Sequence, residues 1–282
     1  MDPSLRAKAE TFAALHRTAH ILVLPNAWDA ASARIFELEG FPAVATTSVG
    51  CSWVLGYPDG ERIPLAEMLL LVRRIAATVD VPVSADMEAG YGATPAAVAA
   101  TVRATIEAGA VGINLEDGAI ADPGRLVDVG YHVEVIREAA RAAAAAGVPI
   151  VINARVDTYL RRVGDESARF DETVRRANAY LDAGAGCAYV MAMQDASTIA
   201  RLAAAIHGPM NIRAGHGAPS IGDLERMGVR RVTFASQPVR ATLALLARIA
   251  HELRTTGTYE LLDQGDLPYG NLNRLLERPR SG

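Results

Sequence analysis

Lysine is nearly absent from this 282-residue chain, and the single one, Lys8, lies in an expected N-terminal helix before the first strand. A Schiff-base mechanism requires a lysine amine, and a phosphate-binding P-loop requires a lysine after its glycine-rich turn. The other cations of the chain are arginine and histidine. The composition therefore leaves almost no candidate for catalysis by lysine.

Cysteine and long apolar runs are also scarce, and positive charge is not in excess. Cys51 and Cys187 are the only cysteines, which gives neither a zinc-ligand spacing nor a disulfide framework. The net charge is −4 without a basic stripe, which argues against a nucleic-acid surface. The apolar stretch 142–152 is too short to span a bilayer, and the charged residues near the N-terminus do not match a secretory signal. We expect a cytoplasmic protein with no membrane or nucleic-acid partner.

Short apolar runs recur along the chain, with segments of helical pattern between them. Runs that are almost continuously apolar are typical of parallel strands covered on both faces. The expected strands are residues 21–24, 43–46, 81–85, 111–115, 149–153, 187–191, 210–213 and 231–234. Eight strand–helix units predict an α/β fold, a (β/α)8 barrel of the TIM type. A doubly wound sheet is the alternative, although no glycine-rich dinucleotide fingerprint follows the first strand.

No linker or low-complexity tract divides the sequence, so we expect a single domain over residues 1–282. Beyond the eighth strand, residues 238–254 have the pattern of a long helix, and residues 258–280 contain shorter helical stretches. Residues 237–282 are therefore expected to form a helical C-terminal extension. Such an extension either covers the barrel or packs on a neighbouring subunit.

Two acids end the third expected strand. Asp86 and Glu88 are two residues apart, so in an extended chain both side chains project to the same face. The glycine-flanked turn that follows, around Tyr91, can bring backbone close to a small ligand. Carboxylate oxygens suit Mg²⁺, or alternatively Mn²⁺, better than a soft metal. Solvated acids at a strand end are the simpler interpretation of this segment taken alone.

Further polar residues lie at the carboxyl ends of the expected strands, where barrel enzymes place their chemistry. Asp59 follows the second strand, Glu116 ends the fourth, and Asn153 and Arg155 share a face at the end of the fifth. Together with the two acids of the third strand, these carboxylates would repel one another unless a divalent cation neutralises them. Arg155 is suited to bind a substrate carboxylate through two parallel hydrogen bonds. A structural salt bridge with Asp157 or Glu116 is the alternative for this arginine.

Four other side chains are weaker candidates. His216 follows the seventh strand, but a solvated turn histidine is the simpler interpretation. Cys51 is close to the expected site in sequence and fits a small packing residue better than a nucleophile. Tyr159 and Trp53 could wall a pocket, although packing is the usual role of an aromatic side chain.

Six segments, taken together and in order, resemble the isocitrate lyase/phosphoenolpyruvate mutase superfamily. They are Asn26-Ala-Trp-Asp29, Thr47-Ser48, Gly56-Tyr-Pro-Asp59-Gly, Asp86-Met-Glu88-Ala-Gly-Tyr-Gly, Gly112-Ile-Asn-Leu-Glu116-Asp117 and Ile152-Asn-Ala-Arg155. The resemblance extends from about residue 20 to residue 245. The combination is specific, whereas any single segment would be weak evidence.

The resemblance implies a barrel whose helical C-terminus is exchanged between the subunits of a homo-oligomer, a tetramer or a dimer. It also implies a bound Mg²⁺ and, as substrate, a small α-keto or α-hydroxy carboxylate. By position in the family pattern, Asp86 would bind the metal directly. Asp59, Glu88 and Glu116 would hold it directly or through its waters.

The resemblance implies roles for the remaining site residues as well. Arg155 would bind the anionic end of the substrate and act in catalysis together with Asp59 and Glu116. Thr47 and Ser48 would present backbone N–H groups to the substrate carboxylate. The other expected substrate contacts are Gly50, Asn153 and Tyr91.

The chain departs from the family pattern in the loop after the fourth strand. Isocitrate and methylisocitrate lyases carry a Lys-Lys-Cys-Gly-His loop whose cysteine serves as acid or base. Phosphonopyruvate-forming mutases carry a lysine and an Asn-Ser pair in the gating loop after the fourth strand. Here the loop over residues 118–128 has no lysine, cysteine, serine or asparagine. The departure disfavours both of those activities.

Decarboxylation of a β-keto acid is less demanding, because water can protonate the enolate that forms. We therefore expect a Mg²⁺-dependent lyase acting through a chelated enolate, with oxaloacetate-type decarboxylation as the sharpest version. One alternative is C–C cleavage of a substituted malate or a methylisocitrate-like acid, with His216, Tyr159 or water as the acid. Phosphonomutase or phosphonopyruvate hydrolase chemistry, and a non-catalytic protein that binds metal and carboxylate, are further alternatives.

Overall fold

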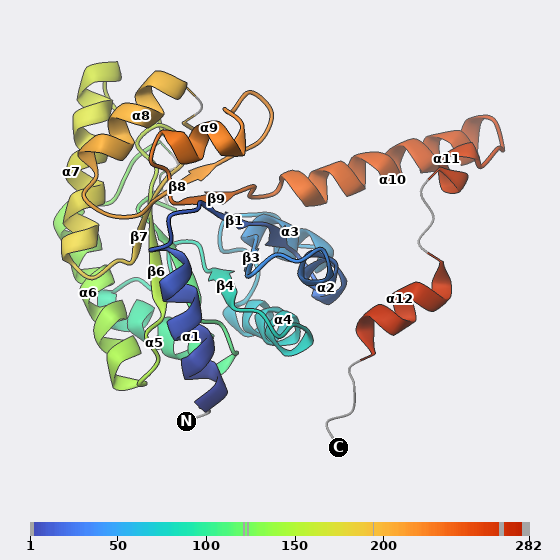
Figure 1. Ribbon diagram of the computed structural model, residues 1–282, viewed down its shortest axis with the longest axis horizontal. Helices are drawn as coiled ribbons and strands as arrows, with labels where there is room; N and C mark the ends of the chain where they lie inside the picture. Colours follow the sequence, from blue (N-terminus) through green and yellow to red (C-terminus); the bar gives the residue numbers. More distant parts are fainter. Residues whose placement is uncertain (1–2, 121, 123, 194, 265–267, 278–282) are drawn as a thin grey trace.

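A ring of parallel strands forms the centre of the computed structural model, which describes residues 3–120, 122, 124–193, 195–264 and 268–277 (Figure 1). The strands are β1 (Leu22–Leu24), β2 (Asn26–Ala27), β3 (Val44–Thr46), β4 (Val83–Asp86), β5 (Gly112–Glu116), β6 (Val151–Val156), β7 (Cys187–Val190), β8 (Met210–Arg213) and β9 (Arg231–Thr233). Each pairs in parallel with its neighbours in the order β1-β9-β8-β7-β6-β5-β4-β3-β2. The expected (β/α)8 barrel is confirmed.

The first strand of the barrel is divided into two pieces, which the sequence did not predict. β1 pairs with β9 and β2 pairs with β3, so together they occupy one position and close the ring. Pro25 lies between the two pieces and has no N–H group to donate to a ladder. Its carbonyl oxygen still accepts a hydrogen bond from the Ala45 backbone (2.8 Å).

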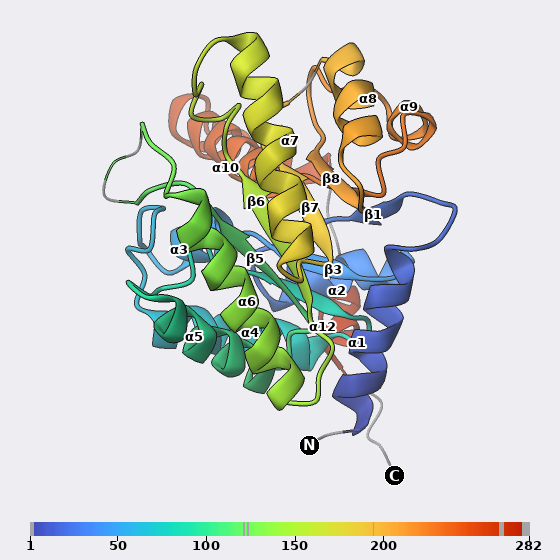
Figure 2. The same cartoon turned by 90° about the vertical axis from the view of Figure 1, so that its left-hand side faces the viewer.

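Twelve helices surround and extend the barrel in the described part of the chain. They are α1 (Pro3–Leu15), α2 (Ala30–Leu38), α3 (Ser48–Val54), α4 (Leu65–Thr78), α5 (Pro95–Glu107), α6 (Val129–Ala145), α7 (Glu166–Asp182), α8 (Ala196–Ala205), α9 (Ile221–Arg226), α10 (Gln237–Thr255), α11 (Glu260–Asp263) and α12 (Tyr269–Leu276). Figure 2 shows α5, α6 and α7 covering one side of the sheet. No helix in the described ranges has the length and hydropathy needed to cross a bilayer.

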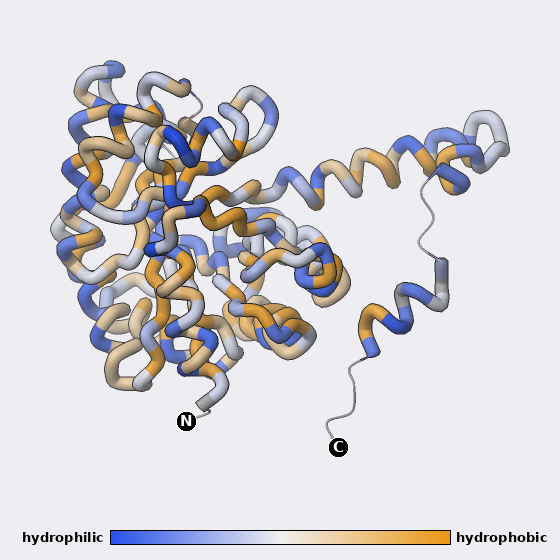
Figure 3. The backbone as a smooth tube through the Cα atoms, in the orientation of Figure 1, coloured by the Kyte–Doolittle hydropathy of each residue, from blue (hydrophilic) through white to orange (hydrophobic). Residues whose placement is uncertain are grey.

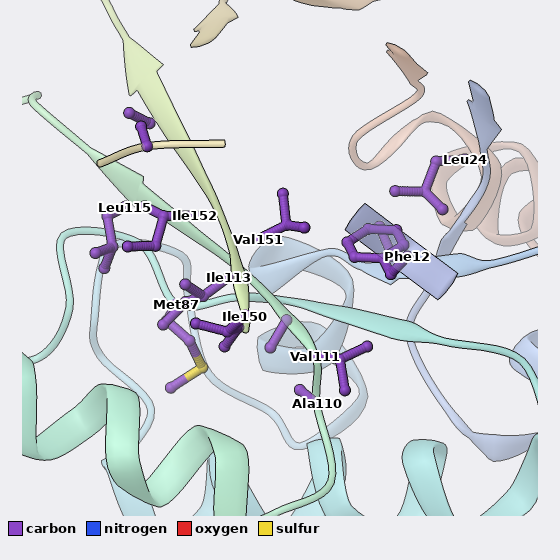
Figure 4. Close-up of a cluster of buried hydrophobic side chains, with 14 of the residues drawn as sticks. Phe12, Leu24, Met87, Ala110, Val111, Ile113, Leu115, Ile150, Val151 and Ile152 are labelled. Carbon is purple, nitrogen blue, oxygen red and sulfur yellow. The ribbon is translucent and has the colours of Figure 1, made fainter. Parts of the chain in front are cut away.

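The hydrophobic core lies between the sheet and its helices, and α1 closes one end of the barrel. Outward-facing Ile113 and Leu115 of β5 and Ile152 of β6 belong to the buried cluster in Figure 4. Phe12 of α1 is fully buried beside Gly112 of β5, where an added Cβ atom would lie 2.5 Å from its ring. The bottom of the barrel is therefore filled by an aromatic ring, and the open end is the opposite one.

The C-terminal extension leaves the barrel. In Figure 1, α10 points away from the sheet with α11 at its far end, and Figure 3 shows polar and apolar residues mixed along it. α12 then packs on α2, where Arg34 Nε donates a hydrogen bond to the Leu275 carbonyl (2.9 Å). The predicted helical character of this region is confirmed for its described residues.

Candidate active site

A cavity of about 420 Å³ opens at the carboxyl ends of the strands, a size typical of small-molecule sites. Acids, amides and arginines dominate its polar wall. These residues are Asn26, Asp59, Arg62, Asp86, Glu88, Asn114, Glu116, Arg155 and Arg161. An apolar part of the wall is formed by Val49, Ala119, Ile120, Leu160 and Met191. The cavity thus combines hard oxygen donors with cations and a small hydrophobic surface.

Asp86 ends β4 and is held from two sides. Its Oδ2 accepts hydrogen bonds from the Ser48 backbone N–H (3.0 Å) and the Ser48 hydroxyl (2.8 Å). Its Oδ1 accepts one from Asn114 Nδ2 (3.1 Å), and Asn153 Nδ2 donates in turn to Asn114 Oδ1 (2.8 Å). The carboxylate is therefore fixed in orientation by a chain of amides. The Ser48 N–H, expected to bind substrate, is engaged by Asp86 here.

Glu88 lines the cavity, but its side chain is not directed there by the alternation of an extended strand. The strand ends at Asp86, and Glu88 has a left-handed backbone with φ of 52°. Glu61 and Tyr91 share this conformation, with φ of 54° each. The backbone N–H of Glu61 donates to Glu88 Oε2 (2.8 Å), and that of Tyr91 donates to Glu61 Oε1 (2.9 Å). Strained backbone held by such cross-bonds is typical of functional sites.

Glu88 and Glu116 carry the most perturbed carboxyl groups of the cavity. Burial, reinforced by Asp86 and Asp59, raises the pKa of Glu88 to about 8. Burial likewise raises the pKa of Glu116 to about 8, against the opposing attraction of Arg155. Both shifts show that negative charge is unfavourable here unless a cation is present.

Arg155 occupies the position expected for an anion-binding residue and also makes the structural ion pairs that were the alternative. Its Nε and Nη2 donate to the two oxygens of Asp157 (2.7 and 3.0 Å), and Nη1 lies 2.5 Å from Glu116. Burial lowers the pKa of Arg155, but the two carboxylates raise it by more than burial lowers it. The pKa therefore lies well above its usual value, and the group stays a cation. A guanidinium has five N–H donors, so Nη1 and Nη2 each retain one for an anion in the cavity.

The oxygen donors of the cavity suit a hard divalent cation in chemical type, but they do not form a complete coordination shell by themselves. No three His, Cys, Asp or Glu side chains in the described ranges form a compact metal-binding group. Mg²⁺ usually keeps several waters and uses one or two carboxylates, which this arrangement can supply. Asp86 fits a direct ligand, with Asp59, Glu88 and Glu116 on the surrounding wall.

Three residues expected to contact substrate do not line the cavity. Gly50 lies inside α3, where a Cβ atom would meet Trp28 at 2.7 Å, so it serves close packing. Asn153 is fully buried below Asn114, and Tyr91 faces a neighbouring cavity. The other predicted contacts, Thr47, Ser48 and Arg155, do line the site.

Several lining residues were not singled out from the sequence. Asn26 was part of a family segment, and its Oδ1 accepts from the Phe234 and Ala235 backbone N–H groups (2.8 and 2.9 Å). Tyr189 lies within β7 and pairs in register with Arg155, so its position in the sixth expected strand could have indicated it. Arg62 and Arg161 lie on connecting loops, where strand alternation gives no signal.

The weaker candidates lie elsewhere. Cys51 is fully buried, and burial raises the pKa of its thiol, which leaves it neutral and suits a packing role. His216 and Trp53 border a groove at the base of α10, and Tyr159 borders another beside α7. None of the described residues lining the central cavity is a histidine, cysteine or lysine.

Comparisons with known proteins give a consistent picture. Residues 12–254 match the family model described as phosphoenolpyruvate phosphomutase. A Mycobacterium tuberculosis protein, uncharacterized protein MT2054, is 35% identical over 94% of this chain and 96% of its own. An oxaloacetate decarboxylase of Rhodopseudomonas palustris is 29% identical over 75% of this chain and 72% of its own. A putative lyase/mutase of Burkholderia cenocepacia superposes with a TM-score of 0.91, at 36% identity and 98% coverage of both chains.

Proposed function

The chain belongs to the phosphoenolpyruvate mutase family, whose named relatives include lyases acting on small carboxylates, and we propose that it is a Mg²⁺-dependent decarboxylase of oxaloacetate or a close analogue. One observation carries the choice of reaction. Apart from Tyr189, whose pKa is raised by burial, the described wall of the cavity offers acids and arginines but no histidine, cysteine or lysine to protonate a departing carbon. A reaction whose enolate is protonated by water needs no such residue.

In this proposal, the acids bind the metal and Arg155 binds the substrate. Asp86 would hold Mg²⁺ directly, and Glu88, Glu116 and Asp59 would hold it directly or through its waters. The bound ion supplies Lewis-acid stabilisation for developing negative charge on the keto oxygen. Asn114 and Ser48 keep the Asp86 carboxylate in place through their hydrogen bonds. The two remaining N–H groups of Arg155 bind a substrate carboxylate end-on.

The test follows pyruvate formation from oxaloacetate by the metal-free protein with added Mg²⁺. We expect a rate well above that of Mg²⁺ alone, a loss of about 10²-fold or more in Asp86→Asn, and a rise in KM in Arg155→Lys, which cannot present the same fork. Asp171→Asn, an exposed acid of α7, is the matched control. A wild-type rate equal to that of Mg²⁺ alone would exclude decarboxylation of this substrate.

C–C cleavage of an alkyl-substituted malate is the second candidate, favoured by the apolar wall. Ile120 and Leu160 are partly exposed at the mouth beside Met191, where an alkyl group could rest. The suggested acids, His216 and Tyr159, do not line the cavity, so water would have to act. A panel of substituted malates, 2-methylisocitrate and phosphonopyruvate separates these activities, and binding without turnover of any of them would indicate a non-catalytic protein. We expect the enzyme to act in the cytoplasm as a homo-oligomer.

A further inference from the structure

The segment between β5 and α6 forms part of the cavity wall through Ala119 and Ile120. Its two ends pair with each other near its base. The backbone N–H of Val127 donates to the Asp117 carbonyl (2.9 Å), and that of Ala119 donates to the Arg125 carbonyl (3.0 Å). For Ala119 and Ile120 to keep a fixed position in the cavity wall, these paired ends must be held against the barrel.

Arg176 of α7 supplies such an anchor from outside the cavity. Its Nη1 donates to Asp117 Oδ2 and to the Val127 carbonyl (3.0 Å each), so one nitrogen holds both ends of the segment. The Tyr180 hydroxyl donates to the same Asp117 oxygen (2.8 Å). The Asp117 carboxylate is fully buried and the Arg176 side chain is 8% exposed, so water does not compete for these bonds.

The same network reaches the anion-binding arginine. Asp117 Oδ1 accepts a hydrogen bond from the Asp157 backbone N–H (2.9 Å), and the Asp117 N–H donates to the Arg155 carbonyl (3.1 Å). Asp157 in turn holds the Arg155 guanidinium through two hydrogen bonds. The end of β6 and the base of the cavity wall are therefore fixed by one buried ion pair.

We propose that Arg176 is a positioning residue for the reaction: its buried pair with Asp117 holds the paired residues 117–119 and 125–127 and the end of β6 in register, and so places Arg155 for the substrate carboxylate. Arg176 is absent from the residues that line the described cavity, so it acts through these neighbours. The Arg176–Asp117–Val127 contacts, called the clamp below, are independent of the proposed function. Only their expected effect on the kinetics rests on it.

The test compares Arg176→Lys, which keeps the charge and loses the planar fork, with Arg175→Lys. Arg175 precedes it on α7, pairs with Glu172 (2.7 Å) as Arg176 also does (2.6 Å), and its side chain is 54% exposed. The measurements are amide hydrogen exchange at Val127, KM and kcat for oxaloacetate with Mg²⁺, and affinity for oxalate.

In Arg176→Lys we expect exchange at Val127 and KM each to rise about tenfold, with kcat changed by less than about threefold. A merely structural role would reduce the amount of active protein and lower kcat at unchanged KM. Tyr180→Phe, which removes only the hydroxyl bond to Asp117, should move the same quantities less and replaces Arg176→Lys if that variant does not fold.

Unchanged exchange at Val127, or an unchanged KM, would overturn the proposal, as would an equal effect of Arg175→Lys. If the wild type has no turnover, the proposed function has failed, and the clamp is then judged by exchange and by oxalate affinity alone. Faster exchange with about tenfold weaker oxalate binding would support it under those conditions. The two failures are therefore distinguishable.

Discussion

Asp86 is the residue on which the proposed metal site depends most. Because its carboxylate is already oriented by Ser48 and Asn114, the proposed Mg²⁺ binding would require little rearrangement. We expect Mg²⁺ at 100 times its Kd to raise the free energy of unfolding of the wild type by about 2.7 kcal/mol. Asp86→Asn should lose this increment, whereas Asp171→Asn should keep it. Denaturant unfolding with Mg²⁺ and with chelator measures the difference, and equal increments in wild type and Asp86→Asn would contradict the assignment.

His132 makes a second prediction at the scale of one residue. Burial, with Arg176 nearby, lowers its pKa to about 3 from the unfolded value of 6.5. Below pH 6.5 the unfolded chain therefore binds a proton that the folded chain does not, and stability is lost as the pH falls. From these values the loss is about 1.4 kcal/mol at pH 5.5 and close to zero at pH 7.5.

Other groups, including Glu88 and Glu116, titrate in the same range with the opposite sign, so the measurement must be a difference. His132→Asn keeps a donor close to the Leu115 carbonyl, with which the ring makes a hydrogen bond, and removes the titration. The free energy of unfolding of this variant relative to wild type should increase by about 1.4 kcal/mol between pH 7.5 and 5.5. A difference that does not vary with pH would show that His132 has the same pKa in the folded and the unfolded chain.

At the scale of elements, α1 and β5 depend on the missing side chain of Gly112. A Cβ atom there would lie 2.5 Å from Phe12 Cε1 and 2.7 Å from Ser84 Oγ, and the Phe12 ring is fully buried. Gly112→Ala should therefore lower the free energy of unfolding by about 1–3 kcal/mol through overpacking. Gly222→Ala in α9, with only Arg226 Nη1 at 3.8 Å, is the control and should be neutral or slightly stabilising. Urea unfolding curves distinguish the two variants. Equal midpoints would show that α1 can move to accommodate the added methyl group without loss of stability.

The elements also show what sequence reasoning can and cannot supply. Asp86, Glu116 and Arg155 were predictable because side-chain alternation and the carboxyl end of a parallel strand fix their face and edge. Alternation does not fix depth: Asn153, two residues before Arg155, points to the same face but lies about 6–7 Å deeper and is covered by Asn114.

Local irregularities were not predictable for a different reason. The helix α3 begins at Ser48, and its N-cap residue Thr47 makes no side-chain cap hydrogen bond, although threonine is a favoured residue at that position. The left-handed conformation of Glu88 is held by Glu61, which is 27 positions away in the chain. Such features depend on contacts between distant segments, and a residue pattern along one segment does not contain them.

At the scale of the whole molecule, the projecting α10 exposes an apolar stripe. Leu243, Leu246 and Leu253 lie on one side at helical spacing and are 44%, 58% and 47% exposed. A 19-residue helix that leaves its own barrel with leucines uncovered is expected to bury them against a second copy of the chain.

We therefore propose that the protein is a dimer or tetramer. The double variant Leu246→Asp with Leu253→Asp should lower its mass in solution toward that of one chain, because two carboxylates would be desolvated in the contact. Arg248→Asp places the same acid on the opposite side of α10, since two residues rotate the helix by about 200°, and should leave the assembly intact. Sedimentation equilibrium measures the mass of each variant. A wild type that sediments as a single chain would contradict the assembly, and a loss of assembly in Arg248→Asp equal to that of the leucine variant would show that the apolar stripe is not the contact.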